Sequence, residues 1–179
     1  MTNFGGEMFD RVGADRLLVS LVPALKGLSA PIELTDQQKS ALLRVSDADL
    51  IRWAGYDENS DPSSLGIDWR DLWVVRTVAA LAMRGRNDDA VLASLVSLAS
   101  DPFKEVRLAV IASLAGRIDF MSVDTLLSLK KDLSWDVALA AVAGLCSSMK
   151  GMYREAQSAL LSSEHIDVDW LDSNVCLGC

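Results

Sequence analysis

Hydrophobic and polar positions repeat along the middle of the chain with a period of 31 residues. Residues 75–101 and 106–132 align without a gap and share nine of 27 positions, and residues 137–163 share seven positions with the second copy. In each copy a valine comes first, and a larger apolar residue follows eight positions later, on the same face of a helix. These pairs are Val75 and Met83, Val106 and Leu114, and Val137 and Leu145. The pattern predicts that each copy begins with a helix, helix A.

The polar residues of the period mark the ends of helices. Gly85 and Gly116 follow helix A, and glycine favours the left-handed conformation in which helices end. Asp88 and Asp119 come three residues later and suit the N-cap of a second helix, helix B. We therefore expect each copy to be a helical hairpin. The A helices are expected near 71–84, 103–115 and 134–147, and the B helices near 88–99, 120–131 and 151–162.

Asp101 and Asp132 close the first two copies, and we expect each to cap the next A helix. Pro102 then falls in the first helical position, where its missing N–H costs nothing. One such hairpin cannot bury its apolar faces alone, whereas three stacked hairpins bury a continuous core.

The repeat resembles the HEAT repeat, and by its short length the HEAT-like repeats of the phycobilin-lyase type. The resemblance rests on Val75-Arg76, Val106-Arg107, the small residues that follow them, and the terminal Asp101 and Asp132, and it covers residues 70–162. In that family the arginine and the aspartate form a ladder between neighbouring repeats, which implies that Arg76 and Arg107 are structural. In the third copy Ala138 replaces the arginine and Ser147-Ser148 replaces Gly-Arg, so the ladder should end there.

The flanking segments do not follow the period. Residues 7–21 are expected to form an amphipathic helix that Pro23 stops, and residues 35–44 begin with a capping-box pattern. A short helix after Ser46 should end near Gly55, and residues 56–68 form a polar loop. We interpret residues 1–69 as a helical N-terminal cap with a loop, 70–101, 102–132 and 133–162 as repeats, and 163–179 as an acidic C-terminal tail.

Composition supports a helical fold. The chain has 27 Leu and 21 Ala among 179 residues, whereas strand proteins depend more on Val, Ile, Thr and aromatic residues. The predicted fold class is all-α: a right-handed α-solenoid of about three HEAT-like helical hairpins with an irregular helical N-terminal cap.

Charge and cysteine content limit the classes of partner and the cellular location that we expect for the chain. The formal net charge is −8, which disfavours binding to nucleic acid or to an anionic membrane surface and favours a basic protein partner. Three cysteines do not form a disulfide framework for a chain of this size, and no signal-peptide pattern or long apolar run is present. We therefore expect reduced thiols and a cytoplasmic location, and leave the oligomeric state open.

Residues for catalysis or for a cofactor are scarce. His165, beside Glu164 and Asp167, is the single histidine, and a metal site needs three or four converging ligands. Cys176 and Cys179 form a terminal C-x-x-C that could be half a metal site, a redox pair or a degenerate prenylation box, but a frayed tail explains it more simply. The sequence predicts no enzyme, no metal and no cofactor.

The tryptophans are expected to pack one repeat on the next. Trp73 and Trp135 lie two periods apart, each at the start of an A helix. The alternative is that they stack on bases, as aromatic residues do in HEAT-like DNA glycosylases, but the acidic charge disfavours this.

An acidic stripe is the candidate partner-binding site. Ala93, Asp124 and Glu155 occupy equivalent positions on the B helices, which usually line the concave face of a HEAT solenoid. Acidic residues in a first helical turn are also common simply because they suit the helix dipole. The candidate partner-binding residues are Asp88, Asp89, Asp119, Asp124, Tyr153, Glu155 and Trp170.

These features favour a non-catalytic protein-binding module. A small acidic helical chain without catalytic groups is similar in type to immunity or antitoxin proteins, which use acidic surfaces to cover basic toxins. The alternatives are a HEAT-like accessory or lyase-type protein that acts on a cofactor-bearing protein, and a relative of the HEAT-like DNA glycosylases. Fold analogy does not choose among them.

Overall fold

The computed structural model describes residues 8–26, 34–57, 60 and 65–161, with side chains described as far as residue 154. Within these ranges the chain is helical and contains no strand, which confirms the predicted all-α class. The helices are α1 (Arg11–Leu25), α2 (Asp36–Leu42), α3 (Asp47–Ala54), the 3-10 helix η2 (Trp69–Asp71), α4 (Leu72–Ala82), α5 (Asp89–Leu98), α6 (Lys104–Leu114), α7 (Phe120–Leu129) and α8 (Trp135–Leu161).

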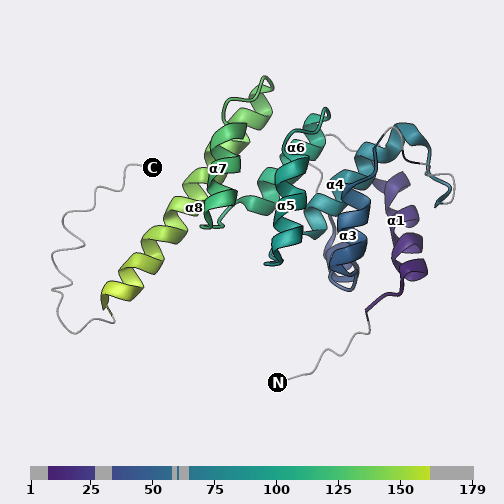
Figure 1. Cartoon of the computed structure of the whole chain (residues 1–179), viewed down its shortest axis with the longest axis horizontal. Coiled ribbons are helices and arrows are strands. Elements are labelled where there is room, and N and C mark those ends of the chain that lie inside the picture. The colour runs from purple at the N-terminus through teal and green to yellow at the C-terminus, as the bar shows by residue number, and fades with distance from the viewer. Residues whose placement is uncertain (1–7, 27–33, 58–59, 61–64, 162–179) are drawn as a thin grey trace.

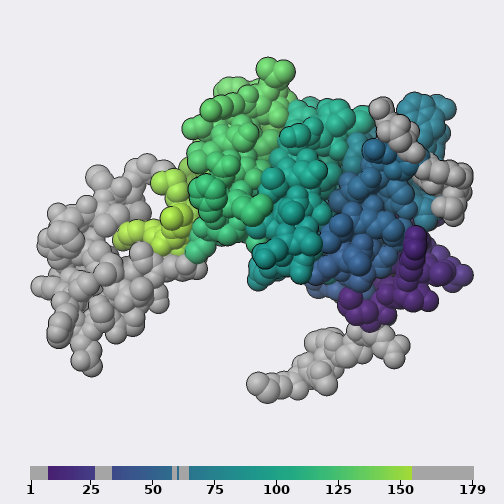
Figure 2. Space-filling model, in the orientation of Figure 1, coloured from purple at the N-terminus to yellow at the C-terminus, as the bar shows by residue number. Residues whose placement is uncertain are grey.

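The helices pack in two rows. Helices α1, α4, α6 and α8 contact one another in succession, and α3, α5 and α7 form a second row beside them. The molecule is therefore elongated, with α1 at one end and α8 at the other (Figure 1). In the space-filling view the surface colours run in order along this axis, from purple at α1 to green at α8 (Figure 2).

The apolar positions of the 31-residue period form the core. Val75, Val106 and Val137 are completely buried, and so are Met83 and Leu114 at the other end of the same helical face. They belong to one hydrophobic cluster that also contains Leu18 of α1 and Trp53 of α3, so the N-terminal helices share the core of the repeats.

The predicted turns between A and B helices are confirmed for the first two copies. Gly85 and Gly116 have φ of 76° and 85°, in the left-handed region. Asp88 accepts a hydrogen bond from the backbone N–H of Ala90 at 2.9 Å and caps α5, and Asp119 caps α7 by accepting from the N–H of Ser122 at 2.8 Å.

The prediction of a third helical hairpin is wrong. Helix α8 runs without interruption through Trp135–Leu161, across the turn expected near residue 148. The reason lies in the residues that replace the turn signals. Ser147 stands where the earlier copies have the left-handed glycine, and Lys150 stands where they have the N-cap aspartate. Without a residue that ends one helix or starts the next, the helical hydrogen bonds continue.

Three smaller expectations about helix ends are also wrong. Pro23 does not stop α1, which continues to Leu25 because Val22 and Leu25 are buried in the core. Helix α6 begins at Lys104, so Pro102 precedes the helix. Asp101 accepts a hydrogen bond from the N–H of Phe103, two residues on, and forms a turn before α6 instead of capping it.

The expected arginine ladder is present, but each Arg–Asp pair lies within one copy, and backbone carbonyls make the link to the preceding segment. Arg76 binds both carboxylate oxygens of Asp101, and Arg107 binds both of Asp132 at 2.7 and 2.9 Å. Each arginine also reaches back to a backbone carbonyl of the preceding hairpin: Arg76 to Tyr56 at 2.9 Å, and Arg107 to Asp101 at 2.7 Å. Hydrogen bonds from Arg107 counteract burial, which alone would raise the pKa of Asp132, and hold that pKa below its ordinary value.

A second ladder, which the sequence analysis missed, lies at the other end of each hairpin, in the turns that lead from the A helices to the B helices. Arg117 donates to the backbone carbonyl of Arg86 at 2.7 Å, and Arg86 donates to the carbonyls of Leu42 and Val45 and pairs with Asp47. The signal was present, because Arg86 and Arg117 are identical residues one period apart. Both ladders end before α8, where Ala138 and Ser148 replace the arginines.

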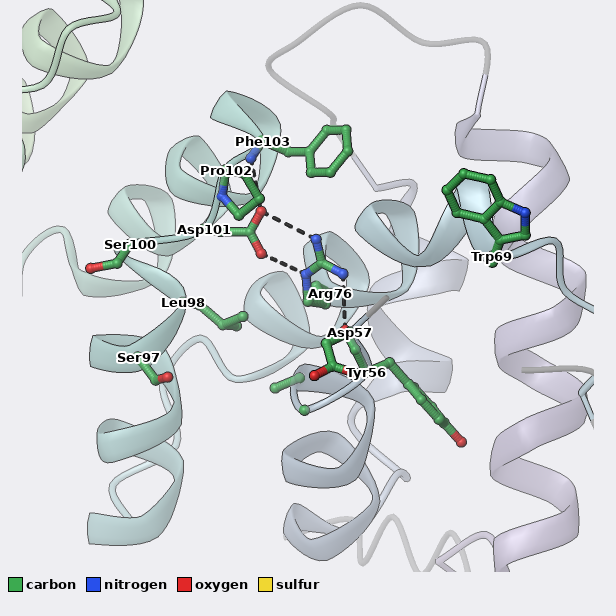
Figure 3. Close-up of a pocket in the computed structure, with 12 residues that line it drawn as sticks. Tyr56, Asp57, Trp69, Arg76, Ser97, Leu98, Ser100, Asp101, Pro102 and Phe103 are labelled. Atoms are coloured by element: carbon green, nitrogen blue, oxygen red, sulfur yellow. Dashed lines mark hydrogen bonds and ion pairs between the residues drawn. The ribbon is translucent and has the colours of Figure 1, made fainter. Parts of the chain in front are cut away.

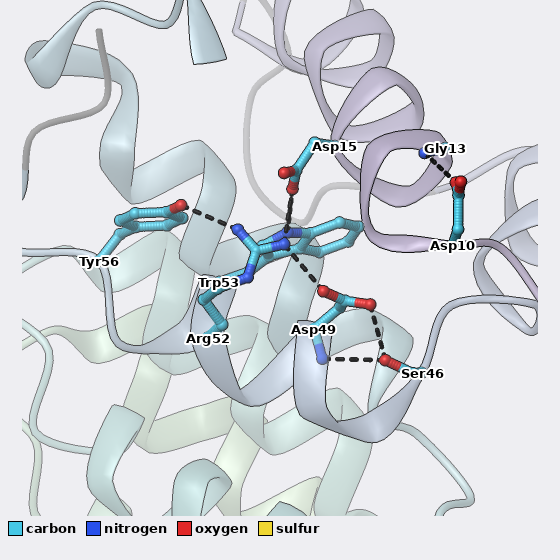
Figure 4. A network of polar contacts seen from close by, with 8 residues as sticks. All are labelled: Asp10, Gly13, Asp15, Ser46, Asp49, Arg52, Trp53 and Tyr56. Atoms are coloured by element: carbon cyan, nitrogen blue, oxygen red, sulfur yellow. Dashed lines mark hydrogen bonds and ion pairs between the residues drawn. The ribbon is translucent and has the colours of Figure 1, made fainter. Parts of the chain in front are cut away.

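A polar network holds α1 against α3 (Figure 4). Arg52 donates to Asp15 of α1 at 2.7 Å, to Asp49 at 2.9 Å and to the hydroxyl of Tyr56 at 3.0 Å, and the indole N–H of Trp53 also reaches Asp15. Burial alone would raise the pKa of Asp49, but hydrogen bonds from Arg52 and Ser46 outweigh it and lower that pKa.

Candidate functional site

The predicted acidic residues fall into three groups. Asp88, Asp89 and Asp124 are exposed, on or next to the neighbouring helices α5 and α7. Tyr153 is half-buried on α8. Glu155 belongs to the same helix, but its side chain lies outside the described residues, as does Trp170. The described acidic residues therefore lie on α5 and α7 or at their N-caps, and these two helices contact each other.

Asp119 differs from the other acids because its carboxylate is already engaged. It accepts hydrogen bonds from the N–H and the hydroxyl of Ser122, both at 2.8 Å, and from Arg117 at 3.0 Å. Burial alone would raise its pKa, but these bonds lower the pKa below the ordinary value. Asp119 is ionised at neutral pH and is committed to the start of α7.

Large apolar side chains lie exposed among these acids, and the sequence analysis missed them. On α7, Phe120 is 82 % exposed, and Met121 and Leu127 are 44 % and 41 % exposed. Phe120 stands one period after Asp89, and Asp124 stands one period after Ala93. The departure from the repeat at Phe120 was a usable signal, because the equivalent Asp89 is a polar, solvent-facing type of residue and phenylalanine is more often buried.

We define the α5–α7 surface as Asp88, Asp89, Phe120, Met121, Asp124 and Leu127. Exposed apolar residues beside acidic ones are typical of a protein-binding surface, where buried aromatic side chains supply much of the affinity and polar residues form the rim. Lys130 and Lys131 are exposed at the C-terminal end of α7, so the negative charge is confined to its first two turns and the adjacent start of α5.

A separate pocket of about 550 Å³ lies where α3 and α5 end, beside the first half of α4 and the segment before α6 (Figure 3). Trp69 and Phe103 stand at its sides, and Trp73 stacks on Phe103 with ring centres 6.0 Å apart. Its charged residues include Arg76 and Asp101, which are bound to each other in the first ladder. The pair is therefore structural, and the pocket offers aromatic faces and the hydroxyls of Ser97 and Ser100.

The two tryptophans predicted to pack between repeats behave differently. Trp73 packs as expected, whereas Trp135 is 76 % exposed at the start of α8. An apolar groove of about 570 Å³ lies between α6 and α8, lined by side chains that include Leu108, Ile111 and Leu139. The C-terminal end of the molecule thus carries uncovered apolar surface within the described residues.

The described residues show neither a cluster of metal ligands nor a membrane-spanning helix. They contain no group of three or more His, Cys, Asp or Glu side chains placed to hold a metal ion. His165, Cys176 and Cys179 lie outside the described ranges. Of the helices placed by the structure, none is both long enough and apolar enough to cross a membrane.

Comparison of the chain with protein-family models, with curated proteins and with solved structures finds no match.

Proposed function

We propose that the chain is a non-catalytic protein-binding module built as a short right-handed HEAT-like α-solenoid. Two observations support the solenoid: the two rows of successively packed helices, and the arginine–aspartate contacts that recur after 31 residues. In such a scaffold each repeat contacts only its neighbours and leaves an extended surface for recognition.

The exposure of Phe120 on α7, one helical turn before the exposed Asp124 and on a helix that contacts α5, carries the proposal. A phenylalanine that is 82 % exposed gains free energy when a partner covers it, because its apolar surface then leaves water. The surrounding acids make a basic partner the complementary one, and opposite charges speed the encounter of two proteins. The net charge of −8 acts in the same direction.

The partner class that fits is a basic protein whose own positive site is covered in the complex. This is the mode of action of an immunity or antitoxin-type inhibitor, in which acidic groups occupy a cationic site and the apolar residues add affinity. It requires no catalytic group and no cofactor on this chain.

The test begins with a partner captured from the native host and purified. Phe120→Ala should raise the Kd for that partner by about tenfold to several hundredfold, the range of one interface hot spot. Val12→Ala is the matched control, because Val12 is 56 % exposed on α1, at the opposite end of the molecule from α7 (Figure 1). If both variants bind as tightly as the wild type, the α5–α7 surface is not the binding site.

A further inference from the structure

The outer face of α8 carries an apolar stripe of six residues with a heptad-like spacing. Successive members are separated by four, three, four, three and four positions, the spacing that keeps side chains on one face of a long helix. The stripe consists of Trp135, Leu139, Val142, Cys146, Met149 and Tyr153. Trp135, Leu139, Val142 and Met149 are 76, 56, 47 and 62 % exposed, and Cys146 and Tyr153 are half-buried.

The 31-residue period explains what this stripe is. Leu108, Ile111 and Ala115 of α6 are the equivalents of Leu139, Val142 and Cys146, and they lie against α8. A Cβ added to Gly144 of α8 would lie 3.5 Å from Ile111 and 3.6 Å from Ala115. The part of the stripe from Leu139 to Cys146 therefore corresponds to the face that α6 turns toward α8, and α8 is the last described helix of the row (Figure 1).

The stripe is symmetric about the level of residue 144. We consider a second copy of α8 that runs antiparallel to the first and crosses it at residue 144. Trp135 then lies opposite Tyr153 of the other copy, Leu139 opposite Met149, and Val142 opposite Cys146. Each pair is apolar, and each joins a larger residue to a smaller or more flexible one, apart from the central pair of two small residues. The match is the self-complementarity that a two-fold interface needs.

Charges beside the stripe have the same symmetry. Asp136 follows Trp135, and Lys150 follows Met149, so the antiparallel arrangement brings Asp136 of each copy alongside Lys150 of the other. Asp136 is 61 % exposed and also pairs with Lys104 of α6 at 2.9 Å, so Lys150 of the second copy would join that ion pair. At the midpoint of this edge Ala143 meets its own counterpart, and its small side chain allows close approach.

We propose that two copies of this chain associate through an antiparallel pair of α8 helices, with the two-fold axis at the level of residue 144. A row of exposed apolar side chains on one helix face gains free energy when a second such face covers it. The stripe spans 18 helical steps, about 27 Å, and a buried tryptophan contributes about 150–250 Å² toward the roughly 800 Å² per partner of a specific interface. The α5–α7 surface is not part of this pair, so the proposal stands apart from the proposed function.

Sedimentation equilibrium of the full chain tests the association. The wild type should be dimeric at about 50 µM, a concentration at which a dimer with micromolar Kd is largely assembled. Met149→Glu should weaken the dimer at least about a hundredfold, because it places a charge against the Leu139 of the second copy. Leu43→Glu, the same kind of change at an exposed residue of α2, should leave the dimer intact. A monomeric wild type, or equal weakening by both variants, overturns the proposal.

A disulfide cross-link tests the register and the occupant. In Val142→Cys the introduced thiol should form a disulfide with Cys146 of the second copy, because a disulfide requires Cα atoms within about 7 Å, and the product should run as a covalent dimer on a non-reducing gel. A 142–146 link inside a monomer, one turn apart on the same helix, counts as absence of the intermolecular link. Ser128→Cys, an exposed position on α7, should give no such link to Cys146. Links are mapped by mass spectrometry after mild oxidation. An intramolecular link from position 142 to Cys176 or Cys179 would show that the chain's own C-terminal segment covers the stripe, and would overturn the proposal, as would the absence of a 142–146 link.

Discussion

Arg107 donates a hydrogen bond to the backbone carbonyl of Asp101, while the carboxylate of the same aspartate binds Arg76. One residue thus receives the arginines of two successive hairpins, one through its main chain and one through its side chain. Because Asp101 is only 8 % exposed, both contacts are shielded from water, which strengthens them. The contact fixes the distance between hairpins and explains why these residues recur in both copies.

Replacing Arg107 by alanine should lower the free energy of unfolding by about 3 kcal/mol, because it leaves the carboxylate of Asp132 and the carbonyl of Asp101 without their donor in a poorly hydrated site. Urea denaturation measures the change. Arg84→Ala is the control: Arg84 is exposed, and its replacement should change the free energy of unfolding by less than about 0.5 kcal/mol. Equal losses would mean that the ladder contributes no specific stability.

Gly116 and Ser147 are equivalent positions one period apart. Replacing either residue by the type found at the other should lower the free energy of unfolding. Gly116→Ser places a side chain at φ 85° and should cost about 1–2 kcal/mol. A Cβ there would come no closer than 3.5 Å to its nearest neighbour, the hydroxyl of Ser147, so the cost is conformational and not steric. Ser147→Gly, inside α8, should cost roughly 0.5–1 kcal/mol. Thermal unfolding of each variant decides this, and a stabilising Ser147→Gly would contradict the account of the continuous helix.

Stability should fall in acid because several native carboxylates ionise more readily than in the unfolded chain. The folded-state pKa values of Asp49, Asp119 and Asp132 are lowered from an ordinary value of 3.8. Each group contributes its full stabilisation above that ordinary pKa, and the contribution is lost as the pH falls through the lower folded-state pKa.

Urea denaturation at a series of pH values from 7 down to 2 should therefore show little change above pH 5 and a steep loss of stability below pH 4. In Asp132→Ala the loss below pH 4 should be shallower, because one of the contributing carboxylates is gone. The same slope in the variant and the wild type would contradict the assignment for Asp132.

Charge reversal on α7 should slow the association with a basic partner. Asp124→Lys should reduce the association rate constant at low salt by a factor of a few to about tenfold and flatten its dependence on salt, because exposed interface charges act mainly on the encounter. Stability should change by less than about 1 kcal/mol. Asp36→Lys on α2 makes the same change in net charge away from the α5–α7 surface. If the two variants slow association equally, only the total charge matters.

Local signals made much of the fold predictable. Gly85, Gly116, Asp88 and Asp119 act on the turn in which they stand, so their residue types alone place the helix ends of the first two hairpins. The same signals are missing at Ser147 and Lys150. The third hairpin was predicted because apolar residues continue at helical spacing on both sides of that point, and such spacing does not distinguish two helices from one.

The candidate site was less predictable because exposure depends on what packs nearby. The acidic residues of the α5–α7 surface are polar by type and could be placed on a solvent-facing side. Phe120 and Leu127 are apolar by type, so the sequence alone favours burial, and only the packed structure leaves them uncovered. The prediction that Pro23 ends α1 was also wrong. The local preference of proline to end a helix is outweighed there by the burial of Val22 and Leu25.

The two arginine ladders make the middle of the array modular. A duplicate of residues 102–132 inserted after Asp132 would bring its own copies of Arg107 and Arg117, and these would find the carbonyls of Asp132 and Arg117 in the places that Asp101 and Arg86 occupy now. The duplicate would end in its own aspartate and present the same face to α8. Within α8 both series are interrupted, because Ala138 and Ser148 replace the arginines. An added repeat is therefore expected to fit at Asp132, between two copies that carry the arginines and carbonyls it needs.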